Sequence, residues 1–179
     1  MGHEVSQACM RRGMTLAPVG LTGPGMPQSC QVKEGETTVE VTLVGEPGAQ
    51  KKALEELKAK HGEKLVIIDF THPTAVNPNS ELYAAAGVNF VFGTTGGDRE
   101  KLMKVTQDSG VYAVIAPNMG KQIVALQATM ERMAKDFPGA FGGYKLEVTE
   151  SHQKTKADTS GTAKAMASWQ AKGPVGWLF

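Results

Sequence analysis

The chain has 179 residues, of which 41% are hydrophobic, and a formal net charge of +1 from 19 basic and 18 acidic residues. This apolar content predicts a packed soluble core of one domain or two small ones, rather than disorder. The balanced charge indicates no nucleic acid and no anionic membrane as a partner, since both would favour a basic surplus. The longest apolar runs have the length of a strand and are far too short to span a membrane.

The two cysteines, Cys9 and Cys30, are far apart in the sequence and lie in no spacing typical of a metal site. We therefore expect two reduced thiols in a reducing compartment and no bound metal. The first residues, MGHEVSQACMRRG, contain basic side chains but no apolar segment and no cleavage site of a signal peptide. The sequence start is thus expected to be part of the fold, not a targeting segment.

Hydrophobic periodicity predicts strands and helices that alternate from about residue 14 to residue 120. The expected elements are a helix at 2–12, a strand at 14–21, a loop at 22–28, a strand at 37–44, a helix at 47–62, a fully buried strand at 64–70, a helix ending at Gly87, a strand within 88–97, a helix closed by Gly110 and a strand within 111–120. Such alternation is typical of βαβ units, so we predict an α/β fold with a parallel sheet and helices on both faces.

The pattern changes after residue 120. We expect a long helix from about 120 to 136, stopped by Pro138, then a half-exposed strand over 144–152 and a helix at 160–171. These elements predict the start of a second, α+β domain. The sequence is therefore divided into a first domain at 1–118 and a partial second domain at 119–179.

Three predicted strands end in polar or Gly-rich turns: DFTHP at 69–73, GTTGG at 93–97 and APNMG at 116–120. Because ligands in parallel sheets bind at the carboxyl ends of the strands, these turns should meet at one ligand-binding edge. Each turn taken alone could be an ordinary loop. Asp69 could be a helix cap or a ligand contact, and His72 is more typical of a loop than of a catalytic site.

The segment ESHQKTKADTSGTA, residues 150–163, combines groups for proton transfer with a site for an anion. His152 can exchange a proton near neutral pH, and Lys154 and Lys156 can hold a carboxylate or donate a proton. The Ser-Gly-Thr sequence that follows lies at a predicted helix start, where free N–H groups bind small anions. A solvated strand end and a routine helix cap would explain each residue singly, but the whole set less well.

Taken in order, the segments IDFT, GTTG, APNMGKQ, MAKDFPGAFGGY and ESHQKTKADTSGTA resemble 4-hydroxy-tetrahydrodipicolinate reductase. The similarity is to the branch of plants and green algae in particular, and covers roughly residues 1–172. It implies a Rossmann-like sheet followed by the start of an α+β domain for substrate binding and oligomerisation.

The resemblance implies an NADPH- or NADH-dependent oxidoreductase of the diaminopimelate route of lysine biosynthesis. Its substrate would be a small dicarboxylate, 4-hydroxy-tetrahydrodipicolinate, which is reduced to tetrahydrodipicolinate. The family is homo-oligomeric, and its plant branch implies a chloroplast location, with the cytoplasm as the alternative. The sequence leaves the choice between NADPH and NADH open.

The resemblance also assigns site residues. The implied catalytic residues are His152 and Lys156, with Lys156 as the proton donor. The implied substrate contacts are Gln153, Gly161 and Thr162, where Gln153 replaces a second histidine found in many bacterial members. The implied cofactor contacts are Phe70, Gly93, Thr94, Thr95, Ala116, Pro117, Asn118 and Met119. No metal is implied.

Compared with this family, the chain is expected to be truncated at both ends. The family's first strand and most of its Gly-rich loop have no counterpart here, and the final GPVGWLF resembles no part of the family. We therefore expect two unpaired strand edges, and an inactive fragment is one possible outcome. The alternative is a non-catalytic, reductase-like scaffold or assembly factor, although the intact set at 150–163 disfavours it. A third interpretation, a Rossmann-type dehydrogenase for another substrate, is disfavoured by the same set.

Overall fold

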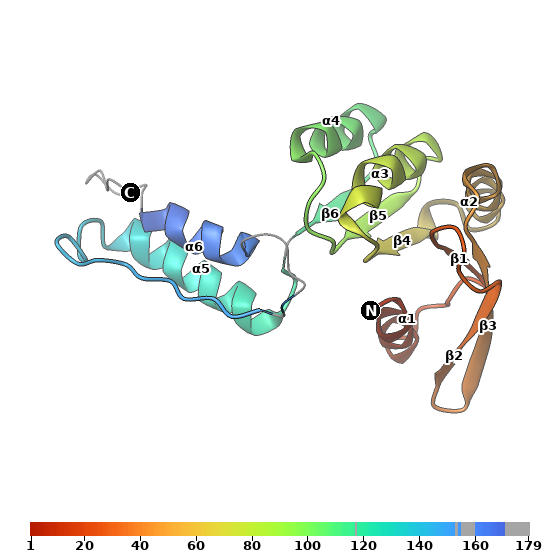
Figure 1. Ribbon diagram of the computed structural model, residues 1–179, viewed down its shortest axis with the longest axis horizontal. Coiled ribbons are helices and arrows are strands. Elements are labelled where there is room, and N and C mark those ends of the chain that lie inside the picture. Colours follow the sequence, from red (N-terminus) through yellow and green to blue (C-terminus); the bar gives the residue numbers. More distant parts are fainter. Residues whose placement is uncertain (117, 153, 155–159, 171–179) are drawn as a thin grey trace. The chain divides into compact units, whose positions relative to one another are not determined.

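The structure is a computed structural model of residues 1–179, and it describes residues 1–116, 118–152, 154 and 160–170. The chain divides into two compact units, Met1–Ile115 and Ala116–Phe179, which are considered one at a time (Figure 1). The first unit contains all the strands of the described residues. The described part of the second unit consists of two helices and the segments around them.

The first unit follows the predicted alternation of strands and helices. Its helices are α1 (Gly2–Arg11), α2 (Pro47–His61), α3 (Val76–Ala85) and α4 (Arg99–Ser109), with short 3-10 helices at Gly62–Lys64 and Pro73–Ala75. Its strands are β1 (Val19–Leu21), β2 (Ser29–Glu34), β3 (Thr37–Val44), β4 (Val66–Asp69), β5 (Asn89–Phe92) and β6 (Ala113–Ile115). Gly110 ends α4 in a left-handed conformation with φ 69°, as its position in the sequence predicts.

The strands form two sheets of three strands each. One has the order β1-β3-β2, in which β1 is parallel and β2 antiparallel to β3. The other has the order β4-β5-β6 and is parallel throughout. This parallel sheet with its helices confirms the predicted α/β class. Among the described residues, the outer strands β1, β2, β4 and β6 are each hydrogen-bonded to a strand on one side only.

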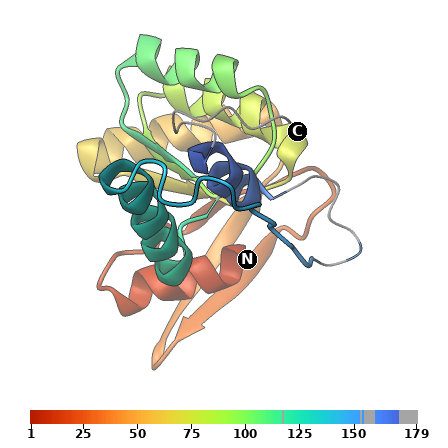
Figure 2. The same ribbon diagram turned by 90° about the vertical axis from the view of Figure 1, so that its left-hand side faces the viewer.

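The core of the first unit lies on one face of the parallel sheet. Helices α3 and α4 lie side by side over this face (Figures 1 and 2). The rings of Tyr83, Phe90 and Phe92 meet there, with centroids 5.1 to 5.8 Å apart. Leu54 of α2 belongs to the same cluster, and Leu21 of β1 packs against it. The cluster therefore joins both sheets through α2 and β1.

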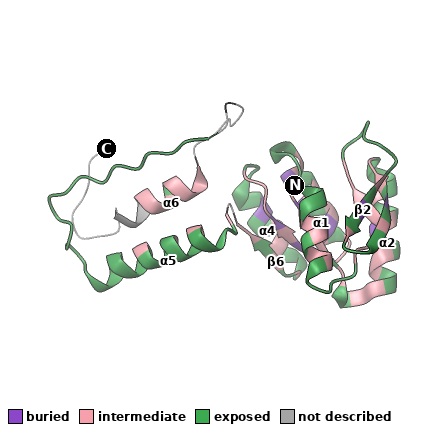
Figure 3. Cartoon of the chain, turned by 90° about the horizontal axis from the view of Figure 1, so that it is seen from below, coloured by how far each residue is buried: buried purple, intermediate pink, exposed green. Residues whose placement is uncertain are grey.

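The opposite face of the parallel sheet is exposed at Val66, Ile68 and Val114. The prediction of a fully buried strand over 64–70 is therefore wrong. A strand points alternate side chains to opposite faces, and here the core covers only the face that carries Ile67 and Asp69. The buried residues of the described chain, purple in Figure 3, all lie in the first unit.

Three other predictions are corrected. The strand expected over 14–21 is confined to β1, because Pro18, just before it, has no N–H to donate. The antiparallel strand β2 was not predicted; it joins β3 through a two-residue turn in which Gly35 has φ 57°. Residues 144–152 form no strand, because the described part of the second unit offers no other strand to pair with.

The second unit is a pair of packed helices, α5 (Lys121–Asp136) and α6 (Gly161–Gln170), as the sequence predicts (Figure 1). Ile123, Gln127 and Met130 are half-buried at helical spacing, while most other residues of α5 are exposed (Figure 3). This narrow stripe is the face of α5 that is shielded from solvent, and the spacing of its residues follows the helical period.

Candidate functional site

The carboxyl ends of the three parallel strands lie in register. Asp69 pairs with Phe92, and Phe92 pairs with Ile115, so β4, β5 and β6 end at the same level of the sheet. This confirms the prediction that these strand ends share one edge. The segments after β4 and β5 therefore leave the sheet next to each other, where parallel sheets bind ligands.

The loops after β4 and β5 interlock closely. The backbone N–H of Gly93 donates to the carbonyl oxygen of Asp69 at 2.9 Å, and the Thr94 hydroxyl donates to the carbonyl oxygen of Thr71 at 2.8 Å. The Phe70 ring lies directly against the Cα of Gly93 and leaves no room for a Cβ there. Three of the predicted cofactor contacts, Phe70, Gly93 and Thr94, are thus brought together, and Thr95 follows them in the same loop.

Replacing Gly93 with alanine is expected to lower the free energy of unfolding by about 1–3 kcal/mol, the usual cost of overpacking. The new methyl group would occupy the space of the Phe70 ring, which would have to move. The loss should largely disappear in a Phe70→Ala background, because the ring that the methyl group meets is then absent. Urea unfolding of both single variants and the double variant measures this coupling.

Gly48→Ala is the matched control, since nothing lies within 4 Å of a Cβ at this position in the first turn of α2. It should leave the stability of the chain nearly unchanged. If Gly93→Ala lowered the free energy of unfolding as much in the Phe70→Ala background as in the wild type, the close packing of the two loops would be contradicted.

Below these loops, Asp69 and Tyr83 form a buried polar pair. Asp69 is 3% exposed, Tyr83 is 2% exposed, and the Tyr83 hydroxyl donates to Asp69 Oδ2 at 2.8 Å. Burial raises the pKa of the Tyr83 phenol far above its ordinary value, and the Asp69 carboxylate adds to the effect. The phenol therefore stays protonated in the folded chain and remains a donor to the carboxylate.

The raised pKa of Tyr83 predicts a loss of stability in alkali. The stabilisation is fully present below the unfolded pKa of about 10 and is lost as the pH rises toward the higher folded value. Between pH 9 and pH 11, the free energy of unfolding should therefore fall by about 1.4 kcal/mol more in the wild type than in Tyr83→Phe. Urea unfolding at both pH values measures the difference. Equal losses in the two proteins would show that the phenol ionises in the folded state as readily as in the unfolded state.

His72 has a structural role, as the sequence indicates for a loop histidine. Its Nδ1 accepts a hydrogen bond from the backbone N–H of Thr74 at 3.4 Å and lies 3.0 Å from the Thr74 hydroxyl. It thereby caps the short helix Pro73–Ala75. This arrangement gives His72 no part in the candidate site.

The second unit brings together the start of α6 and the turn before α5. Asn118 Oδ1 accepts from the backbone N–H of Gly120 at 2.7 Å, and Asn118 Nδ2 lies 3.5 Å from Thr162 Oγ1. The Ser160 hydroxyl caps α6 by accepting from the N–H of Ala163 at 3.3 Å. Asn118 and Thr162, predicted for different ligands, are therefore neighbours.

Glu150 links the helix start to the predicted catalytic histidine. Its two carboxylate oxygens accept from the backbone N–H of Ser160 at 3.0 and 3.2 Å. Its Oε2 also lies 3.9 Å from His152 Nδ1, close enough for an ion pair when the imidazole is protonated. A carboxylate, an imidazole and a helix N-terminus thus meet at one place, with the His152 side chain still partly open to solvent.

The remaining predicted residues divide between the units. Ala116 and Met119 lie in the turn that carries Asn118, with Ala116 half-buried and Met119 exposed. Gly161 opens α6. Pro117, Gln153 and Lys156 lie outside the described residues. The predicted cofactor contacts thus belong partly to the first unit and partly to the second, and each group is considered within its own unit.

Sequence reasoning missed three side chains that hold the strand-end loops: Asn77, Asn79 and Tyr83, all on α3. Asn79 Nδ2 donates to Asp69 Oδ2 at 2.8 Å, and Asn77 exchanges two hydrogen bonds with the backbone of Asp98. The only signal in the sequence was the pair of asparagines in the first turns of a predicted helix, where Asn is unusual.

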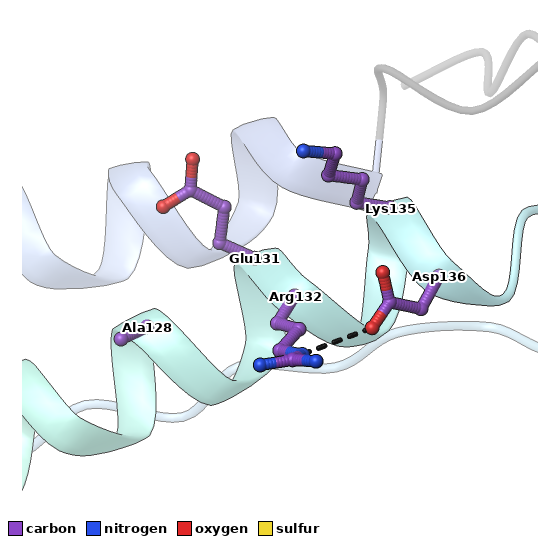
Figure 4. A pocket seen from close by; sticks show the side chains of 5 residues that line it. All are labelled: Ala128, Glu131, Arg132, Lys135 and Asp136. Atoms are coloured by element: carbon purple, nitrogen blue, oxygen red, sulfur yellow. Dashed lines mark hydrogen bonds and ion pairs between the residues drawn. The ribbon is translucent and has the colours of Figure 1, made fainter.

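A depression of about 380 Å³ lies along α5 in the second unit (Figure 4). It is lined by Ala128, Glu131, Arg132, Lys135 and Asp136, and Arg132 and Asp136 form an ion pair of 3.0 Å. All five residues are exposed and none is a predicted site residue.

Among the described residues, no three His, Cys, Asp or Glu side chains are grouped to hold a metal ion. No helix in this part of the chain is long and apolar enough to cross a membrane.

Comparison with known proteins decides the family. The profile described as "Dihydrodipicolinate reductase, N-terminus" matches residues 1–119, which include β4, β5, β6 and their loops. The chain belongs to the dihydrodipicolinate reductase family. The resemblance stated from the sequence is thereby confirmed, and with it the Rossmann-like class of the first unit.

Curated relatives extend the match beyond the first unit. The chain is 48% identical over 172 residues to "4-hydroxy-tetrahydrodipicolinate reductase 2, chloroplastic" of Arabidopsis thaliana, covering 94% of the chain and 47% of the relative. It is 46% identical over 170 residues to "Probable 4-hydroxy-tetrahydrodipicolinate reductase 1, chloroplastic" of Oryza sativa subsp. japonica, covering 94% and 48%. The reductase of Methanocaldococcus jannaschii is 34% identical over 137 residues, which cover 73% of the chain and 48% of that relative. The chain spans about half the length of these family members.

Proposed function

We propose that the chain takes part in the NAD(P)H-dependent reduction of 4-hydroxy-tetrahydrodipicolinate to tetrahydrodipicolinate, in the diaminopimelate route of lysine biosynthesis. The observation that carries the proposal is the family match over residues 1–119, together with the interlocked loops after β4 and β5. These loops lie at the strand ends where the fold class binds its ligands.

The first unit is proposed as the dinucleotide-binding domain, within residues 1–118, and residues 119–179 as part of the substrate-binding domain. The division of the chain after Ile115 supports this assignment. NADPH or NADH, when bound, supplies the hydride for the reduction. A flat ring is proposed to lie against the loop after β5, on which the Phe70 ring packs at Gly93 and which the Thr94 hydroxyl holds by its bond to Thr71.

The start of α6 is proposed as the site for a substrate carboxylate. The first N–H groups of a helix have no partner inside the helix, so Gly161 and Thr162 can present theirs to an anion. Thr162 adds a hydroxyl, which Asn118 Nδ2 approaches to 3.5 Å. His152 and Lys156 are the proposed proton-transfer residues, with Gln153 as a further substrate contact. Glu150 Oε2 lies 3.9 Å from His152 Nδ1, beside the start of α6.

The location and assembly of the chain follow from its relatives only as proposals. The plant relatives carry "chloroplastic" in their names, and we propose the chloroplast for this chain also. We likewise propose a homo-oligomer as the working state. The scaffold alternative keeps the fold but needs no proton-transfer group, so the presence of His152 beside the α6 start favours the enzyme.

The function is tested by NADPH oxidation at 340 nm, with the full chain and with the substrate generated in situ by the synthase that forms it. Turnover above the rate without the chain, lost in Thr162→Val, supports the reductase. A folded chain that neither oxidises NADPH nor binds it would favour the scaffold alternative. Binding of NADPH without turnover would support the cofactor site and contradict catalysis by this chain.

A further inference from the structure

The carboxylate of Asp69 is the centre of a buried hydrogen-bond network at the end of β4. Its Oδ1 accepts from the backbone N–H of Thr71 at 2.7 Å and from the Thr71 hydroxyl at 2.6 Å. Its Oδ2 accepts from Asn79 Nδ2 and from the Tyr83 hydroxyl, both at 2.8 Å. All four donors are neutral and come from the strand end or from α3. Such a fully satisfied buried carboxylate fixes its partners strongly.

The network reaches the second strand-end loop through Thr71. Asp69 holds Thr71 by two bonds, and the Thr71 carbonyl oxygen accepts from the Thr94 hydroxyl at 2.8 Å. The backbone carbonyl of Asp69 also accepts from the N–H of Gly93 at 2.9 Å. One residue therefore sets both the turn after β4 and the beginning of the loop after β5.

The far end of the second loop is held separately. Asn77 Nδ2 donates to the carbonyl oxygen of Asp98 at 2.9 Å, and Asn77 Oδ1 accepts from the N–H of Asp98 at 2.7 Å. Asp98 in turn caps α4 by accepting from the N–H of Lys101 at 3.0 Å. The loop over 93–98 is thus fixed at both ends by side chains of α3 and by the Asp69 network.

We propose that Asp69 is a positioning residue, which holds the loops at 70–73 and 93–98 in the arrangement that binds the nicotinamide dinucleotide. The inference rests on the proposed function, but it concerns a residue that touches neither cofactor nor substrate. Its role is to make the loops rigid before binding, so that the cofactor does not have to order them. The simpler alternative is that Asp69 only stabilises the fold.

Two variants test the inference on the full chain, Asp69→Asn and Thr71→Val. An amide has one acceptor oxygen, so Asp69→Asn cannot serve both pairs of donors. Thr71→Val removes the hydroxyl that donates to Asp69 Oδ1 at 2.6 Å and accepts from Asn79 Nδ2 at 3.3 Å, with little change in the size of the side chain. Thr106→Val is the matched control, since the Thr106 hydroxyl donates to the carbonyl oxygen of Leu102 inside α4 at 2.9 Å. It loses a comparable bond away from the loops.

Two readouts separate positioning from general stability. Hydrogen exchange of the backbone amides at 70–72 and 93–98 should accelerate about tenfold or more in Asp69→Asn and Thr71→Val, while exchange of the amides of β5 stays unchanged. The Kd for NADPH should rise about tenfold in both, and Thr106→Val should change neither quantity. The inference would be overturned if amide exchange in the two variants accelerated in β5 as much as in the loops, or if it did not accelerate in the loops at all.

The outcomes also distinguish this inference from the proposed function. If wild type binds NADPH and Asp69→Asn binds it equally well, Asp69 is not a positioning residue although the function stands. If wild type binds no NADPH, the proposed function fails and the cofactor part of the inference fails with it. Hydrogen exchange then still decides whether Asp69 fixes the two loops.

Discussion

Replacing His152 with alanine is expected to lower the rate of NADPH-dependent reduction by about 10²–10⁴-fold, the usual contribution of a general acid or base. The imidazole lies next to Glu150 at the start of α6, where the proposed substrate carboxylate binds. Its side chain is 39% exposed, so the fold should tolerate the change. Steady-state oxidation of NADPH, with urea unfolding in parallel, measures both effects.

His61→Ala is the matched control, because His61 ends α2 in the first unit and has no place in the proposed chemistry. It should leave the rate unchanged. The prediction concerns catalysis alone, so NADPH should bind His152→Ala as it binds wild type. An unchanged rate in His152→Ala would remove the histidine from the mechanism and leave Lys156 as the proton donor.

Replacing Phe92 with alanine is expected to lower the free energy of unfolding by about 3–5 kcal/mol. Phe92 is 0% exposed and its ring stacks with Tyr83 at 5.8 Å and meets Phe90 edge-on at 5.1 Å. Its loss leaves a cavity under the carboxyl end of β5, immediately before Gly93. Denaturant unfolding followed by circular dichroism gives the size of the loss.

Val114→Ala provides the comparison for this core position. Val114 lies in the neighbouring strand β6 but on the opposite face of the sheet, where it is 54% exposed. Val114→Ala should change the free energy of unfolding by no more than about 0.5 kcal/mol. Similar losses at Phe92 and Val114 would mean that both faces of the parallel sheet are packed to the same degree.

Helix ends and the parallel strands could be predicted from local signals in the sequence. Gly110 and the run from Asp98 mark the limits of α4, and Pro47 marks the start of α2. The common level of the strand ends follows from parallel pairing alone. These features depend on a few neighbouring residues, so the sequence carries them directly.

One feature that was missed depends on residues far apart in the sequence. The burial of β4 on one face only is decided by where α3 and α4 pack, and the apolar run LVIID cannot show it. Strand β2 was overlooked although Gly35 lies in a two-residue turn between alternating segments, a recognisable hairpin signal.

The candidate site was predicted in part. The turns after β4 and β5 were found by their glycines and polar residues, and the structure brings them together. The role of Asp69 was left between a helix cap and a ligand contact, and the structure shows a buried carboxylate bound to α3 instead. Its partners Asn79 and Tyr83 lie ten and fourteen residues away, beyond the reach of a local motif.

The most direct test is a titration of the full chain with NADPH, followed by the backbone amide chemical shifts. The account predicts that the largest changes occur at Thr71 and over residues 93–98, the loops after β4 and β5. Changes centred on the depression along α5, or no change at millimolar NADPH, would contradict a dinucleotide site at the strand ends.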